Sequence, residues 1–199
     1  MRDETGITAI LSDGEGDGVG ASVTASYIER MAVSLLNQGE NVRMVAEIIA
    51  GTYADVLNKG GSAPGISLVN MTISGKVSFA LFNMPCPIIL KRKKEPVISA
   101  APTSPLVYAY EFSTKNDMMM VFINEGFLLS GKNSVGWSYA DIENYLHSVY
   151  AARTASPEKI THLLLTAANS LEHENPEHDI SVMTLQIKKA GEPGWPIKQ

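Results

Sequence analysis

A glycine-rich loop with three acidic residues is the part of the sequence best suited to chemistry. Residues 12–20 contain Asp13, Glu15 and Asp17 among four glycines. Glycine lets the backbone adopt unusual dihedral angles and approach a ligand closely. Carboxylate and carbonyl oxygens are the ligands that Mg²⁺ and Mn²⁺ prefer. One interpretation of the loop is therefore part of a divalent-metal site for phosphoryl chemistry.

Three other interpretations of this loop stay open. A phosphate-cradling loop fits the glycines, but the P-loop lysine is absent and three acids would repel a phosphate. A calcium loop of the EF-hand kind fits Asp13, Glu15, Asp17 and Gly18, but its twelfth position is Thr24 and not a bidentate Glu. A purely structural turn is the simplest alternative, since Asp and Gly are common in turns.

A two-metal site needs further acidic groups, and the sequence offers two more acidic turns. Glu125 belongs to the first, residues 124–126, which follows an apolar segment. His178 and Asp179 belong to the second, residues 177–179, which precedes the last apolar segment. Each turn adjoins a predicted strand. Three acidic strand ends could converge on one edge of a sheet and supply hard oxygen ligands.

The elements that must position these acids follow from the hydrophobic pattern. Apolar residues that recur every three or four positions predict helices, and short or alternating apolar runs predict strands. The predicted helices are about residues 21–37, about residues 42–57, and two that start near Ser138 and Ser156. The predicted strands are residues 7–11, 66–73, 77–83, 88–90, 107–112, 118–123 and 180–187. Strands grouped together and helices in pairs indicate an α+β fold.

Composition and charge exclude several classes of protein. The chain has 199 residues, of which 45% are hydrophobic and 19% charged, and this predicts a globular chain. We expect one domain over residues 1–199 with an irregular tail at about 190–199. A net charge of −5 argues against general nucleic-acid binding. No apolar run approaches the roughly 20 residues of a membrane span, and no secretory signal opens the chain. We therefore expect a soluble cytoplasmic protein without membrane or nucleic-acid partners.

Other candidates for chemistry have simpler structural interpretations. The single cysteine, Cys86, excludes a disulfide framework and every multi-cysteine zinc site. It lies between two prolines, and we expect a buried structural thiol. Residues 118–120, three consecutive methionines, are expected to pack in the core. Trp137 is expected to anchor the packing of the following helix.

The motifs and their order resemble the metal-dependent protein phosphatases of type 2C, most closely the bacterial branch named after stage II sporulation protein E (SpoIIE). That branch has a strand followed by Asp-x-x-Gly-x-Gly-x-x-Ala and a long helix, and residues 13–21 match this pattern. Three later motifs are matched more loosely. They are the Asn-Ala-Gly-His-x-Pro turn at residues 83–87, Thr-Asp-Gly at 124–126, and Asp-Asp-x-Thr at 178–181. The resemblance covers about residues 6–188.

The resemblance implies a four-layer α-β-β-α sandwich with a two-metal site for Mn²⁺ or Mg²⁺. Water activated by the two metals would attack a phosphoserine or phosphothreonine of a bacterial signalling protein. In relatives the signalling protein that is dephosphorylated is an anti-sigma-factor antagonist, as in the control of sporulation. Carried over by position, Asp13 is the catalytic residue that bridges the metals, and the Gly14 carbonyl binds one of them. Glu125, His178 and Asp179 complete the metal site.

Two departures from the family pattern support an alternative function. Glu125 replaces an Asp and moves the carboxylate outward by about one C–C bond, ~1.5 Å. His178 stands where a metal-binding Asp is expected, and imidazole is a poor Mg²⁺ ligand. The alternative is a catalytically weak or inactive relative that acts as a regulatory protein-binding module. In either case, a helix pair that flanks the site could support a homodimer.

Overall fold

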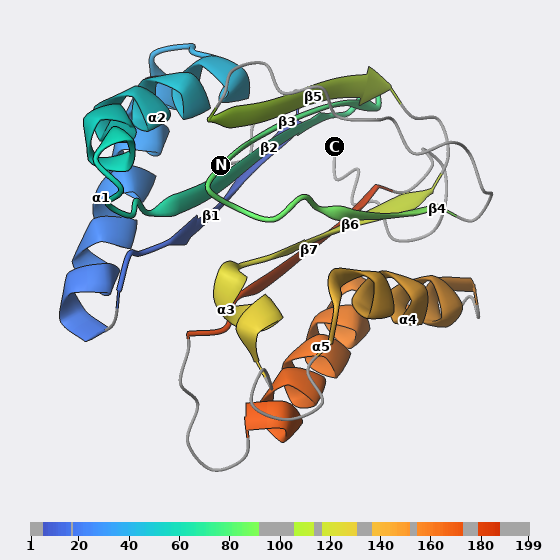
Figure 1. Ribbon diagram of the computed structural model, residues 1–199. Helices are drawn as coiled ribbons and strands as arrows, with labels where there is room; N and C mark the ends of the chain where they lie inside the picture. The colour runs from blue at the N-terminus through green and yellow to red at the C-terminus, as the bar shows by residue number, and fades with distance from the viewer. Residues whose placement is uncertain are drawn as a thin grey trace. The chain divides into compact units, whose positions relative to one another are not determined.

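A computed structural model of the chain describes residues 6–16, 18–91, 106–113, 117–130, 137–151, 155–172 and 179–187. The chain forms two compact units. Unit 1 is residues 1–86 with 98–113, and unit 2 is residues 87–97 with 114–199. Figure 1 shows the elements of both units. The predicted irregular tail lies outside the described residues, and the assignment of a single domain stays a prediction.

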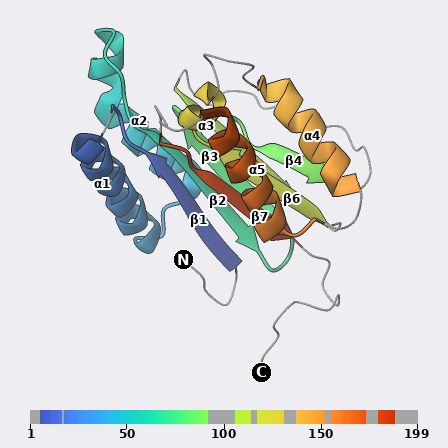
Figure 2. The same ribbon diagram turned by 90° about the horizontal axis from the view of Figure 1, so that it is seen from below.

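Unit 1 is an antiparallel sheet covered by two helices. The sheet has the strand order β1-β2-β3-β5. Its strands are β1 (Gly6–Asp13), β2 (Gly65–Thr72), β3 (Lys76–Phe82) and β5 (Val107–Ser113). Helices α1 (Gly18–Asn37) and α2 (Val42–Asn58) lie on one face of the sheet (Figure 2). Ile28 of α1 and Ile49 of α2 pack in one buried cluster with Ile66, Leu68 and Phe82 of the sheet.

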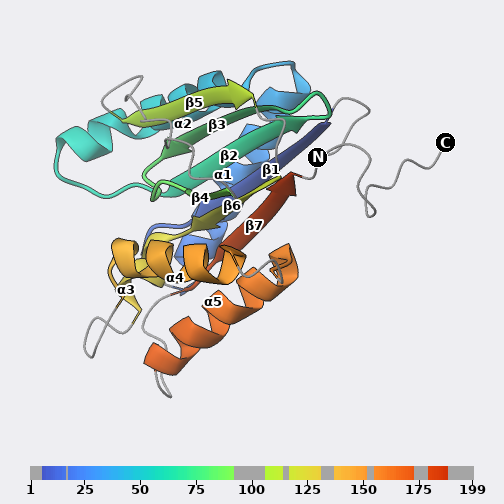
Figure 3. The ribbon, with the colours of Figure 1, turned by 90° about the vertical axis from the view of Figure 1, so that its right-hand side faces the viewer.

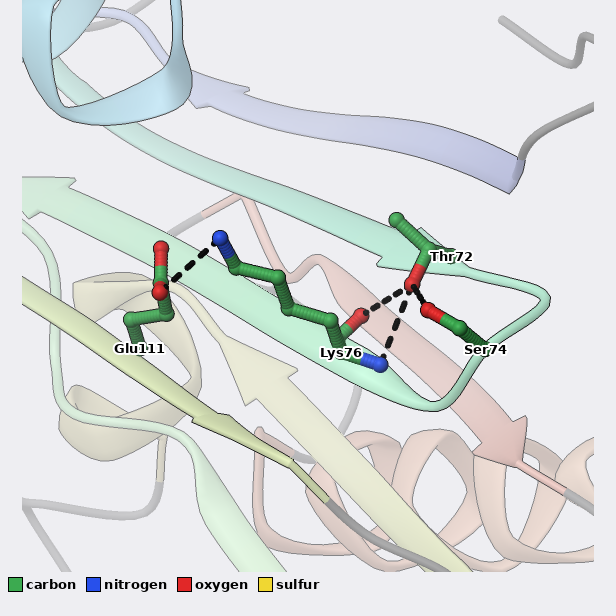
Figure 4. A network of polar contacts seen from close by, with 4 residues as sticks. All are labelled: Thr72, Ser74, Lys76 and Glu111. Atoms are coloured by element: carbon green, nitrogen blue, oxygen red, sulfur yellow. Dashed lines mark hydrogen bonds and ion pairs between the residues drawn. The ribbon is translucent and has the colours of Figure 1, made fainter.

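The β2–β3 hairpin is closed by polar contacts in its turn (Figure 4). The Thr72 hydroxyl accepts a hydrogen bond from the Lys76 backbone N–H at 3.0 Å and lies 2.8 Å from the Ser74 hydroxyl. Gly75 takes a left-handed conformation, φ +85°, which suits a glycine in a tight turn. The Lys76 ammonium lies 2.9 Å from the Glu111 carboxylate on β5, where both side chains are exposed. The hairpin predicted from the alternating pattern is confirmed.

Unit 2 is a second antiparallel sheet with its own helices (Figure 3). The sheet has the order β4-β6-β7, with β4 (Ile88–Lys91), β6 (Met118–Ile123) and β7 (Val182–Ile187). The helices are α3 (Glu125–Leu129), α4 (Tyr139–Ala151) and α5 (Pro157–Glu172). Ile142 of α4 and Ile160 of α5 pack with Met119 and Val121 of β6 in one buried cluster. The predicted burial of the three methionines of β6 is confirmed, since each is fully buried.

Local sequence explains where α4 and α5 begin. The Ser138 hydroxyl accepts from the Asp141 backbone N–H at 3.2 Å, and the Asp141 carboxylate accepts from the Ser138 backbone N–H at 3.0 Å. This is the reciprocal pattern of a capping box. Hydrogen bonds from the Ser138 side chain and backbone lower the pKa of Asp141. The Ser156 hydroxyl accepts from the Lys159 N–H at 3.2 Å, so the second predicted helix start is also confirmed.

Two predictions from the sequence are wrong. Residues 124–126, expected as a turn, instead start helix α3, because the Asn124 side chain caps it by accepting from the Phe127 N–H at 3.1 Å. Cys86, expected as a buried thiol, is exposed. It lies between Pro85 and Pro87 in the connection from β3 to β4.

Helix length and hydropathy bear on the question of a membrane span. Across the ranges that the structure describes, none of the helices combines the length and the apolarity that crossing a membrane requires.

Candidate active site

Asp13 lies at one edge of the unit 1 sheet. It is the last residue of β1 and is half-buried. Across the antiparallel ladder it pairs with Gly65, the first residue of β2. β3 ends at the same edge, since Ile66 pairs with Phe82. The edge therefore gathers Asp13 and the loops that adjoin β1, β2 and β3.

The glycines after Asp13 let the chain turn back onto helix α1. A Cβ atom on Gly14 would lie 1.9 Å from the Ala21 carbonyl oxygen, so no other residue fits without displacing the helix. Gly16 and Gly18 have φ values of +76° and +69°, in the left-handed region that favours glycine. Ala21 is buried, with 5% of its surface exposed. Backbone geometry thus accounts for the glycines at positions 14, 16 and 18, whereas Asp17 lies outside the described residues.

Glu15 ties the loop to the connection between α2 and β2. Its carboxylate accepts a hydrogen bond from the Ser62 hydroxyl, 47 residues away in sequence. Burial raises the pKa of the nearby Tyr53, and the charges of Tyr27 and Glu15 add to this effect. Glu15 is exposed, and its hydrogen bond from Ser62 links the loop to the start of the β2 segment.

The turn after β3 lies beside the start of β2. Asn83 has φ +50°, and its side-chain amide donates to the Ala63 carbonyl. A Cβ atom on Gly65 would lie 2.5 Å from the Asn83 carbonyl oxygen, so the two segments touch through their backbones. The loosely matched turn at residues 83–87 therefore begins at the same sheet edge as Asp13. Burial raises the pKa of the Cys86 thiol, which disfavours the nucleophilic thiolate.

The segments that carry two candidate metal ligands, Glu125 and Asp179, lie against each other in unit 2. Glu125 is the first residue of α3, and Asp179 lies just before β7; both are exposed. A Cβ atom on Gly126 would lie 2.2 Å from the Asp179 carbonyl oxygen, so only glycine permits this approach of the two segments. Two accessible carboxylates on adjacent segments suit a hard divalent cation such as Mg²⁺ or Mn²⁺.

Asn124 is the residue that joins these segments, and the sequence did not single it out. It is 1% exposed. Its amide nitrogen donates to the Asp179 carbonyl at 2.7 Å. Its amide oxygen accepts from the Phe127 N–H at 3.1 Å and from the Ser181 N–H at 3.0 Å. An Asn three residues before an apolar position is a recognisable helix-cap signal, but nothing local indicates the contacts made 55 and 57 residues away.

The predicted ligands are divided between the two units. Asp13 and Gly14 belong to unit 1, and Glu125 and Asp179 belong to unit 2. His178 lies outside the described residues. Among the residues that are described, no three His, Cys, Asp or Glu side chains gather closely enough to hold a metal ion. The complete ligand set therefore stays a prediction, whereas the pairing of the Glu125 and Asp179 segments is a feature of the structure.

Comparison with known proteins identifies the family. A family model described as "Stage II sporulation protein E (SpoIIE)" matches residues 3–188. Comparison with curated protein sequences finds no significant match.

Several solved structures share the fold at low identity. The PP2C phosphatase domain of SpoIIE from Bacillus subtilis, solved with a fragment of its regulatory domain, is 15% identical with a TM-score of 0.68, covering 92% of this chain and 55% of that one. The SiaA-PP2C domain of Pseudomonas aeruginosa is 14% identical with a TM-score of 0.71, covering 94% and 78%. RsbX in complex with magnesium is 15% identical with a TM-score of 0.60, covering 94% and 83%.

These structural likenesses show the fold class of the chain and how much of each solved structure the chain spans. This chain spans about half the length of the SpoIIE structure and of a structure of RsbU and RsbW domains from Mycobacterium tuberculosis. The predicted fold class, α+β of the type 2C phosphatase kind, is confirmed. The predicted resemblance to the SpoIIE branch is confirmed as well.

Proposed function

The chain belongs to the SpoIIE family, and on this premise we propose that it is a metal-dependent protein serine/threonine phosphatase. One observation carries the proposal. Asp13 ends β1 and is followed by a loop in which Gly14 lies against the Ala21 carbonyl and Gly16 and Gly18 are left-handed. The sequence pattern resembles the strand, glycine loop and helix of the family, and the order of β1, loop and α1 supports that resemblance. The fold shared with PP2C phosphatase domains supports the same activity.

The proposed metal ligands are those named from the resemblance. Carried over by position, they are the Asp13 carboxylate, the Gly14 carbonyl and the side chains of Glu125, His178 and Asp179. The magnesium in the RsbX structure supports a divalent cation in this family. Bound Mn²⁺ or Mg²⁺ supplies Lewis-acid activation of water and neutralises charge on the transferring phosphoryl group. The chain's own contribution is to hold oxygen ligands at fixed positions.

The proposed substrate is a phosphoserine or phosphothreonine in a regulatory protein. Solved relatives are described as a cell-fate determinant and as a regulatory component of a secretion system, which supports a signalling role. An anti-sigma-factor antagonist is the specific class that the family resemblance suggests. A homodimer and a cytoplasmic location remain predictions that no observation tests.

A second candidate function is a regulatory protein-binding module of weak or no activity. One observation favours it. Glu125 has a longer side chain than the Asp of the family, and it is exposed on the first turn of α3.

The test compares metal binding and turnover in the same samples. We would measure Mn²⁺ and Mg²⁺ binding by isothermal titration and the hydrolysis of p-nitrophenyl phosphate, for the wild type and for Asp13→Asn. Since loss of a metal's outer-shell partner costs about 10–100-fold in affinity or activity, we expect removal of a direct ligand to cost at least about 100-fold. Asp55→Asn, an exposed aspartate on α2, is the matched control and should match the wild type.

The outcomes separate the two candidates. If Asp13→Asn loses both metal binding and turnover while Asp55→Asn keeps both, the phosphatase is supported. Full turnover in Asp13→Asn refutes the assigned role of this residue. Failure of the wild type to bind either metal at millimolar concentration would favour the protein-binding module.

A further inference from the structure

Asn124 makes more contacts than a helix cap requires. As a cap of α3 it needs only the bond from the Phe127 N–H to its side-chain oxygen. The same oxygen also accepts from the Ser181 N–H, and the side-chain nitrogen donates to the Asp179 carbonyl. All three partners are backbone groups. Two backbone N–H donors face one atom of the side-chain amide, which must therefore be the oxygen. A backbone carbonyl faces the other atom, which must be the nitrogen.

The backbone adds two further contacts at the same place. The Asn124 N–H donates to the Ser181 carbonyl at 3.3 Å. Gly126 lies against the Asp179 carbonyl, where a Cβ atom would come within 2.2 Å. Glu125 therefore lies between two residues that are both held against the segment from Asp179 to Ser181. The backbone positions from which the carboxylates of Glu125 and Asp179 extend are fixed relative to each other.

We propose that Asn124 is a positioning residue that holds Glu125 and Asp179 together as two oxygen ligands of one divalent-metal site. This inference rests on the proposed function, because it takes the two carboxylates as metal ligands. The hydrogen bonds of the buried Asn124 side chain to Asp179 and Ser181 keep the two segments arranged before the metal binds. Outer-shell groups of this kind set metal affinity as well as structure.

The test separates positioning from helix capping by the variant Asn124→Ser. Serine is as good a helix cap as asparagine, so it keeps the bond to the Phe127 N–H. Its shorter side chain cannot also reach the Ser181 N–H and the Asp179 carbonyl. We expect the dissociation constant for Mn²⁺ to rise about 10–100-fold in the full chain, measured by water-proton relaxation with Mn²⁺ alone. Hydrogen exchange should become faster at the Ser181 amide while the helices remain protected.

Asn41→Ser is the matched control. Asn41 caps α2 in unit 1, where its side-chain oxygen accepts from the Met44 N–H at 3.0 Å. The variant Asn41→Ser makes the same substitution at another helix N-cap, and its Mn²⁺ affinity should stay at the wild-type value. A second variant, Asn124→Gly, removes all the side-chain hydrogen bonds without adding a charge, and glycine is tolerated at a helix N-cap. It should also weaken Mn²⁺ binding, so that the inference does not depend on the serine variant alone.

Each outcome decides the inference. Weaker Mn²⁺ binding in both Asn124 variants and unchanged binding in Asn41→Ser support it. Wild-type affinity in the Asn124 variants overturns this inference alone and leaves the proposed function intact. Equal losses in Asn41→Ser and Asn124→Ser indicate general destabilisation and overturn it as well. Absence of Mn²⁺ binding in the wild type overturns the proposed function and this inference together.

Discussion

Replacing Gly14 by alanine tests the geometry of the glycine loop directly. The added Cβ atom would lie 1.9 Å from the Ala21 carbonyl oxygen, 2.4 Å from its carbonyl carbon and 2.7 Å from its Cα. All three atoms are backbone atoms of helix α1, so no side-chain rotation relieves the overlap. Non-bonded heavy atoms need a separation of about 3.5 Å. The loop and the first turns of α1 must therefore move apart by about 1.5 Å.

The energetic cost follows from the packing of α1. Ala21 is buried, and further along the same helix Ile28 and Ala32 belong to the unit 1 core. Overpacking of a tightly packed site costs about 1–3 kcal/mol. Because backbone atoms alone oppose the new methyl group, we expect the upper end, about 3 kcal/mol, for Gly14→Ala. The measurement is urea denaturation followed by circular dichroism, with a chelator present so that no metal contributes.

Gly51→Ala is the matched control for this substitution. Gly51 lies inside helix α2, and a Cβ atom built on it meets nothing within 4 Å. Alanine is a better helix former than glycine by about 1 kcal/mol, so this variant should be more stable than the wild type. The same chemical change should thus have opposite signs at the two positions. A Gly14→Ala variant as stable as the wild type would refute the close approach of the loop to Ala21.

Two further predictions concern titratable groups. Asp141 has a lowered pKa in the folded state, so its contribution to stability is present above its ordinary pKa of 3.8 and is lost as the pH falls through the folded value. Asp141→Asn should therefore lose less stability on acidification than the wild type, measured by urea denaturation from neutral to acidic pH, while Asp55→Asn serves as the control. Cys86 is exposed but has a raised pKa, so less of it is thiolate at neutral pH. Its alkylation by iodoacetamide should be slower than that of a cysteine peptide, and an equal rate would contradict the raised pKa.

Much of the secondary structure could be predicted because its causes are local. The predicted strand over residues 118–123 agrees with β6, and the pairing of Ser156 with Pro157 marked the start of α5. Helix α1 begins three residues before its predicted start at Ala21, since Gly18 already takes part in the helix. Short α3 was missed because five residues are too few to show a helical period.

The candidate site was predictable only where it lies within one stretch of chain. The order Asp13, Gly14, Gly16, Gly18 places a carboxylate at a strand end and glycines where left-handed or crowded backbone requires them. These are properties of neighbouring residues, and a pattern of residue types records them. The sequence alone thus determined the glycine loop, the family resemblance that it carries, and the elements on either side.

Tertiary structure alone decided how distant segments meet. Asn124 bonds to Asp179 and Ser181 only because β6 and β7 pair as neighbours, with Ile123 opposite Val182. That pairing depends on the packing of α4 and α5 over the sheet, which no local pattern specifies. The exposure of Cys86 has the same origin, since it depends on which strands pair around it. The sequence therefore predicted Glu125 and Asp179 as candidate ligands. Only the fold brought their segments together, because burial and long-range hydrogen bonding depend on the whole chain.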